Sequence, residues 1–308
     1  MQIALPSTWR RYRDGLQTIP WLLLTGYGVM ILVYGALASV LLPAAWQRPF
    51  LHCLLTVPLL LLVAKDLACY PLAFARWKAA SARGESLWRR LVATQPPEFR
   101  GYLRLERAMW RGFFNWARQR PQPARPVGQA LGYLDRGAYG TVICCVLLAL
   151  FVELPIDVMI ASVMAESPEE LRMMHIGFGM LAAYGFVWVV GDRWHVTGRG
   201  HHVLTATSLE LDIGPRGSGS IPLAAIASCE RLTDSRAAWC KRHGHVLHAT
   251  RKLSPFDAPN LVLLLEPGSD VRLLLLQVER GGDGPIFLYV DRPEQLISAV
   301  QRPSPVLP

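Results

Sequence analysis

Long apolar segments alternate with polar, arginine-rich stretches over the first two thirds of the chain. The four segments cover residues 21–42, 51–74, 138–164 and 173–190. A helix rises about 1.5 Å per residue, so roughly 20 apolar residues cross the hydrocarbon core of a bilayer. The pattern therefore predicts four membrane-spanning helices, arranged as two helical hairpins with short outer connectors.

Arginines lie mainly on one side of these segments, and this sets the expected orientation. Cytoplasmic loops of membrane proteins carry the excess of lysine and arginine. We therefore expect a multi-pass protein of the bacterial inner membrane, with both termini and the loop between the hairpins in the cytoplasm. The basic residues are Arg10, Arg11 and Arg13 before the first segment, the arginines of the 76–137 loop, and Arg193 and Arg199 after the fourth, against Arg48 and Arg172 in the two outer connectors.

The pattern changes after residue 193 to short alternating runs, which are typical of β-strands. A final helix is expected from Asp291 as N-cap, Pro293 in the first turn and Glu294 at capping-box spacing. The sequence thus predicts an all-β barrel or two-sheet roll with one helix over an open edge. The expected strands cover residues 201–205, 209–213, 220–223, 227–231, 245–250, 260–265, 271–278 and 286–290.

Two stretches of this region resemble bacterial PH-like domains that follow membrane hairpins. One is Leu209-Glu-Leu-Asp-Ile-Gly with Ser220-Ile-Pro-Leu-Ala-Ala-Ile226; the other runs from Asn260-Leu-Val-Leu-Leu-Leu265 to Leu288-Tyr-Val-Asp-Arg-Pro-Glu294. The resemblance covers about the last third of the chain. It implies a PH-like barrel, without a shared catalytic activity or a set of site residues.

We therefore expect a multi-domain protein, a four-helix transmembrane bundle plus a C-terminal all-β PH-like barrel with one capping helix. The expected parts are an N-terminal segment and first hairpin (1–75), a cytoplasmic basic loop (76–137), a second hairpin (138–192) and a cytoplasmic PH-like domain (193–308). The hydrophobic fraction of 52% and mean hydropathy of +0.25 agree with a membrane chain that ends in a soluble domain.

The net charge of +9 flanks apolar spans rather than forming a basic domain with base-stacking aromatics. We expect anionic lipids of the inner leaflet as partners, and no nucleic acid. The six cysteines lack CxxC spacing and are expected to be free. No cofactor is expected.

Residues 98–120 of the basic loop predict an amphipathic helix, and a shorter one is expected near 86–93. Tyr102, Leu105, Met109, Phe113 and Trp116 share one face. This face suits either the membrane interface, which the opposite arginine face favours, or packing on the C-terminal domain. The predicted lipid-binding residues are Arg100, Arg104, Arg107, Arg111, Arg118 and Trp116.

Ionisable residues within the apolar segments are candidates for function, because a charge in the bilayer is costly. Lys65 is expected to reach the inner interface, and Asp66 to accept a structural hydrogen bond. Carboxylates and imidazoles near the outer face could bind a metal or carry a proton, although ordinary interfacial placement explains them as well. These low-priority catalytic candidates are Glu153, Asp157 and His175, and His52 joins them as a possible metal ligand; no metal site is predicted outright.

Two functional hypotheses follow. The first is a membrane scaffold or regulatory protein whose C-terminal domain binds a protein partner or a lipid headgroup. The second is a small transporter or membrane enzyme that uses the outer Glu, Asp and His residues. No GxSxG, HExxH or nucleotide-binding motif occurs in a suitable context, which favours a non-enzymatic role. Small residues such as Gly179 and Ala183 leave homo-oligomerisation open.

Overall fold

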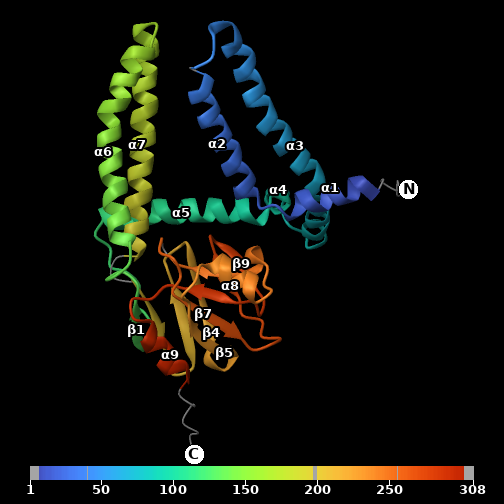
Figure 1. Ribbon diagram of the computed structural model, residues 1–308, viewed down its shortest axis with the longest axis vertical. Coiled ribbons are helices and arrows are strands. Elements are labelled where there is room, and N and C mark those ends of the chain that lie inside the picture. The colour runs from blue at the N-terminus through green and yellow to red at the C-terminus, as the bar shows by residue number, and fades with distance from the viewer. Residues whose placement is uncertain (1–6, 40, 197–199, 255, 302–308) are drawn as a thin grey trace, which may run out of the picture. The chain divides into compact units, whose positions relative to one another are not determined.

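The computed structural model describes residues 7–39, 41–196, 200–254 and 256–301 (Figure 1). Arg199 lies outside the described residues, and only the backbone is described for Arg10, Arg11 and Arg48. The chain forms two compact units, Met1–Tyr102 and Leu103–Pro308. The basic loop is divided between them.

The first unit is helical. It contains α1 (Ser7–Thr18), α2 (Trp21–Ser39), α3 (Ala44–Ala82), α4 (Leu87–Thr94) and the first turns of α5 (Pro97–Ala117). Helix α3 extends beyond the apolar segment that predicted it, and it contains Pro49, Pro58 and Pro71. Helix α1 was not predicted, because its apolar positions are few.

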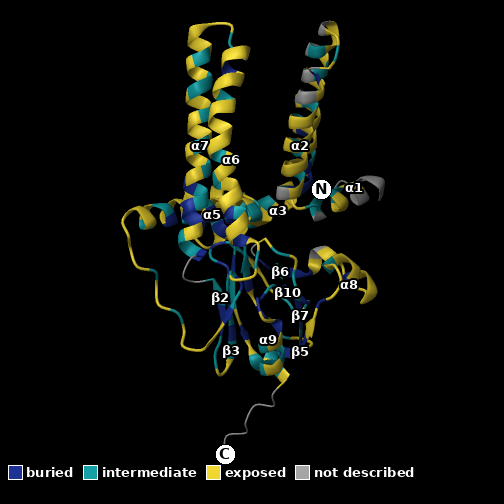
Figure 2. Ribbon diagram, turned by 60° about the vertical axis from the view of Figure 1, so that its left-hand side comes forward, coloured by how far each residue is buried: buried dark blue, intermediate teal, exposed yellow. Residues whose placement is uncertain are grey.

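The second unit contains the rest of α5, a helical hairpin and the β domain. Helices α6 (Tyr139–Met164) and α7 (Pro168–Val196) pack side by side, as the apolar pattern predicted. Both are exposed along most of their length, and buried residues gather at the end of the hairpin beside the β domain (Figure 2). An apolar exposed surface is expected for helices that face lipid rather than water.

Among the described residues, three helices are long and apolar enough to cross a membrane: Ala45–Ala82, Tyr139–Val163 and Pro168–Val196. Helix α2 contributes the shorter apolar stretch Leu23–Gly35 within the described residues. Length and composition therefore support membrane association for three of the four predicted spans, and the fourth stays a prediction.

The β domain consists of two sheets over one shared core. The six-stranded sheet has the order β1-β2-β3-β4-β8-β9, and the four-stranded sheet the order β5-β7-β10-β6. All pairs are antiparallel except β10 with β6. The strands are β1 (Gln129–Gly132), β2 (His201–Leu204), β3 (Ser208–Asp212), β4 (Gly217–Pro222), β5 (Ile226–Arg231), β6 (Arg251–Leu253), β7 (Leu261–Leu265), β8 (Leu273–Leu275), β9 (Val278–Arg280) and β10 (Ile286–Leu288).

The core explains why the two sheets face each other. Alternate residues of β3 and β7, such as Leu209 and Leu261, point inward with Leu131 of β1 and Leu288 of β10. Helix α9 (Pro293–Gln301) adds Leu296 to this core and packs on β5. The expected closed barrel is wrong, because the strands divide into two separate sheets. The two-sheet alternative agrees with the structure.

Two strand predictions fail for local reasons. Residues 245–250 form a loop and the short 3₁₀ helix Leu247–Ala249, which follow helix α8 (Arg236–Arg242). Residues 271–278 are not one strand, because Leu276 and Gln277 adopt positive φ angles of 48° and 61° and turn β8 back onto β9. Strand β1 was missed altogether, and it brings part of the basic loop into the β domain.

Candidate functional site: the junction of the α6–α7 hairpin with the β domain

Strand β1 precedes α6, and its partner β2 follows α7. Leu131 pairs with His202 and Gly132 pairs with His201 in antiparallel register. The whole hairpin therefore lies between two neighbouring strands of one sheet. Side chains around this point form the junction, which has three groups of contacts: at the end of α7, at the lead-in to α6, and along the 122–125 segment.

The first group surrounds Asp192, near the end of α7. Its Oδ1 lies 3.0 Å from Nε of Arg216, which comes from the turn between β3 and β4. Its Oδ2 accepts a hydrogen bond of 2.9 Å from the Tyr139 hydroxyl, at the start of α6. One carboxylate thus joins both helices of the hairpin to the β domain.

The Arg216 guanidinium is also covered by aromatic rings. Its Cζ lies 4.7 Å from the ring centroid of Phe256 and 5.6 Å from that of Tyr139. The two rings stack on each other at 5.8 Å. Such cation–π contacts add attraction for a guanidinium that is largely removed from water.

The second group consists of two aspartates that bind the backbone leading into α6. Asp291 accepts hydrogen bonds from the amides of Asp135 and Arg136, both at 3.0 Å. Asp257 accepts one of 2.7 Å from the amide of Ala138, which directly precedes α6. Amides at a helix N-terminus lack partners inside the helix and favour negative charge. Asp291, which the sequence indicated as the cap of the last helix, instead directs both oxygens to this lead-in.

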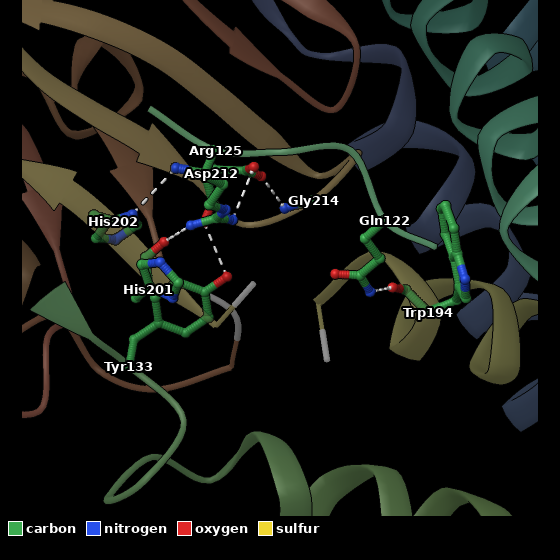
Figure 3. A network of polar contacts seen from close by, with 8 residues as sticks. All are labelled: Gln122, Arg125, Tyr133, Trp194, His201, His202, Asp212 and Gly214. Carbon is green, nitrogen blue, oxygen red and sulfur yellow. Dashed lines mark hydrogen bonds and ion pairs between the residues drawn. The ribbon is translucent and has the colours of Figure 1, made fainter. Parts of the chain in front are cut away.

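The third group ties residues 122–125 to the β domain and to α7 (Figure 3). Gln122 donates a hydrogen bond to the carbonyl of Trp194. Arg125 donates to the His201 carbonyl and pairs with Asp212 at 2.9 Å. The segment after α5 is therefore held against the β domain by side-chain contacts rather than by sheet pairing.

Two buried rings lie beside Asp212. The Tyr133 hydroxyl donates to the Asp212 carbonyl at 2.9 Å, and burial followed by the nearby Asp212 charge raises the pKa of Tyr133. The His202 Nδ1 accepts the Asp212 amide at 3.1 Å, and the two rings are 5.0 Å apart. Full burial, then the charges of Arg125 and His201, lower the pKa of His202 to about 3. His202 is therefore neutral in the folded protein at ordinary pH.

Helix α5 crosses α7 close to the junction. The crossing depends on glycine, because a Cβ added to Gly191 would lie 2.1 Å from the Met109 carbonyl oxygen, and one added to Gly112 would lie 2.5 Å from the Gly191 oxygen. The His195 ring nitrogen Nε2 is 2.9 Å from the Ala108 carbonyl. Small residues permit such close approach of helix backbones.

A carboxylate reinforces this crossing. Glu106 of α5 accepts hydrogen bonds of 2.7 Å from Trp110 in the same helix and from Tyr184 and Trp188 of α7. Leu105 and Met109 are buried. The middle of the predicted aromatic face is therefore protein-packed, so the membrane-interface interpretation is wrong for these two residues.

The six predicted lipid-binding residues, five arginines and Trp116, stay predictions. Arg107, Arg111 and Trp116 are exposed on α5, and Arg100 is half-buried. Arg104 donates to the Gln277 carbonyl of the β8–β9 turn, and the Arg118 guanidinium lies 5.9 Å from the Phe114 ring.

The acidic and imidazole candidates of the apolar helices do not form a metal site. Within the described part of the chain, no group of three or more His, Cys, Asp or Glu side chains could hold a metal ion. Glu153 is exposed on α6, Asp157 and His175 are half-exposed, and His52 is exposed in the first unit. A catalytic role for these residues remains a hypothesis.

Lys65 also differs from expectation. Lys65 is 1% exposed, and its ammonium binds the carbonyls of Leu16, Gln17 and Ile19 at the end of α1. Cations are favoured at helix C-termini. Asp66 is exposed on α3, and its role as a structural acceptor stays a prediction.

Comparison with protein-family models, curated proteins and solved structures finds no match to this chain. The resemblance to PH-like domains therefore rests on the quoted residues alone.

Proposed function

We propose that this chain is an integral scaffold or regulatory protein of the bacterial inner membrane, whose PH-like β domain binds a protein partner or a lipid headgroup at the cytoplasmic face. The apolar helices and the one-sided arginines support the location. The observation that carries the proposal is the junction, because the buried Asp192–Arg216 ion pair and three carboxylate–amide contacts fix the β domain to the α6–α7 hairpin.

A binding domain gains from such attachment. A flexible linker would let the domain sample many orientations, and binding would then have to order it at an entropic cost. A domain fixed at the end of a membrane hairpin presents one surface to the membrane and to membrane-bound partners. The contacts of Asp192, Asp257 and Asp291 fix the orientation of the β domain, and this role requires no catalytic group.

Truncation after Gly191 tests the proposal. The shortened protein should still insert into the membrane but lose the partners that chemical cross-linking recovers with the full chain. Glu153→Gln in the full chain is the matched control, and it should recover the same partners. Normal partner recovery with the truncated protein, or its loss with Glu153→Gln, would contradict the scaffold and favour a role for the helices themselves.

A further inference from the structure

The first unit contains a cavity of about 940 Å³ between α2, α3 and the start of α5. Its walls are mainly apolar, and Gly26 leaves open space because an added Cβ there would meet no atom within 4 Å. Cavities of 300–1,000 Å³ with apolar walls and a few polar groups are typical ligand sites. This cavity is large enough for an alkyl chain with a headgroup.

The charged side chains that line the cavity are acidic. Asp66 and Glu98 line it, whereas no lysine or arginine is among the described residues of its lining. Lys65, next to Asp66 in sequence, directs its ammonium to the carbonyls at the end of α1 and over the ring of Trp21, whose centroid is 5.3 Å away. Successive residues of a helix point about 100° apart, so the two side chains serve different surroundings.

Aromatic rings accompany the carboxylates. Phe99 and Tyr102 contribute to the same lining, together with Trp21, whose ring lies next to the Lys65 ammonium. Carboxylates together with aromatic faces attract an alkylammonium group, the carboxylate through charge and the rings through their quadrupoles. An anionic headgroup would meet repulsion here, in contrast to the arginine face of α5.

We propose that this cavity binds an amphiphile with a cationic ammonium head and a hydrocarbon tail. The head pairs with Asp66 beside the rings of Phe99 and Tyr102, and the tail lies along the apolar walls of α2 and α3. The site is independent of the scaffold function, because it lies wholly within the first unit.

Equilibrium dialysis of the full-length protein in uncharged maltoside micelles tests this site, with radiolabelled dodecyltrimethylammonium as the probe and protein-free micelles as the blank. The wild type should bind one probe molecule saturably. Asp66→Asn should weaken binding roughly tenfold, as expected for loss of a charge-assisted contact. Asp157→Asn, which changes a carboxylate in α6, is the matched control and should bind as the wild type does.

Two further measurements separate the site from misfolding. Gly26→Leu fills the cavity from α2, whereas Asp66 lies on α3, and this change should also abolish saturable binding. Both Asp66→Asn and Gly26→Leu should keep the wild-type thermal unfolding midpoint. Dodecyl sulfate should fail to compete with the probe. Unchanged binding by Asp66→Asn or by Gly26→Leu, or equal competition by dodecyl sulfate, would overturn the proposal.

Discussion

The guanidinium Nε of Arg216 lies 3.0 Å from the carboxylate Oδ1 of Asp192, so a turn of the β domain is ion-paired with the end of a candidate membrane helix. Both side chains are largely buried, with 15% and 9% exposed. Removing one partner of a buried pair leaves the other charge uncompensated, which costs more than the pair itself contributes.

Arg216→Met should therefore lower the free energy of unfolding by about 3 kcal/mol. Denaturant unfolding of the protein in detergent, followed by tryptophan fluorescence, measures this loss. Arg231→Met is the matched control, because the Arg231–Glu294 pair is 63% and 66% exposed and should contribute less than about 1 kcal/mol. The double change Arg216→Met with Asp192→Asn, which removes both charges and keeps an amide oxygen to accept the Tyr139 hydroxyl, should recover most of the loss; failure to recover would mean that the ion pair is not the cause.

Asp291→Ala should release the backbone that leads into α6. It removes the acceptors of the Asp135 and Arg136 amides, and the loss of each of these partly buried hydrogen bonds costs about 1 kcal/mol. Hydrogen–deuterium exchange should accelerate at these two amides. Asp270→Ala, which removes an exposed partner of Arg272, should leave their exchange unchanged. Equal protection in Asp291→Ala would contradict the proposed attachment.

Acidification should destabilise the β domain through His202. The pKa of His202 is lowered from 6.5 to about 3 on folding, so the unfolded chain binds a proton that the folded protein does not. Stability from the neutral ring is fully present above about pH 6.5 and falls as the pH drops toward 3. Carboxylates also titrate in this pH range and change the stability of any variant. The pH dependence of the wild type is therefore compared with that of His202→Asn, whose side-chain carbonyl oxygen can still accept a hydrogen bond from the Asp212 amide.

The wild type should lose more stability than His202→Asn between pH 7.5 and pH 4.5, as measured by thermal unfolding midpoints. The physical reason is that asparagine has no proton to gain. Parallel pH profiles of the two proteins would show that His202 is accessible to protons in the folded state.

Gly191→Ala should separate α5 from α7. Its Cβ would overlap the Met109 carbonyl oxygen, a backbone atom that cannot move without shifting the helix. Overpacking of this kind typically costs about 1–3 kcal/mol. Gly177→Ala is the matched control in the same helix, because its Cβ would meet no atom within 4 Å. Disulfide cross-linking between cysteines introduced into α5 and α7 should fall only in Gly191→Ala.

Local patterns predicted the elements but not their contacts. The apolar runs indicated α6 and α7, and alternation indicated β3, β5 and β7, because these signals are carried by neighbouring residues. Strand β1 has the sequence Gln-Ala-Leu-Gly, which lacks alternation and β-branched residues, so only its pairing with β2 makes it a strand.

The junction could not be predicted for a related reason. The partners of Asp192, Tyr139 and Arg216, lie in distant parts of the chain. Glu106 lies among arginines in the sequence, so an ion pair within α5 is the expectation there, whereas its carboxylate accepts a hydrogen bond from Tyr184 of α7. One signal was available: Asp192 is an acidic residue at the end of an apolar segment, where a basic residue is usual. That exception marked a residue with a specific partner.

The position of β1 has a consequence for synthesis of the protein. Because Gly132 pairs with His201, α6 and α7 together occupy the place of the loop in a β-hairpin. Strand β1 leaves the ribosome before both helices, and it stays without its partner until β2 has been made. Pairing of β1 with β2 brings the two ends of the hairpin together, so this edge of the sheet forms only once the complete α6–α7 hairpin has been synthesised.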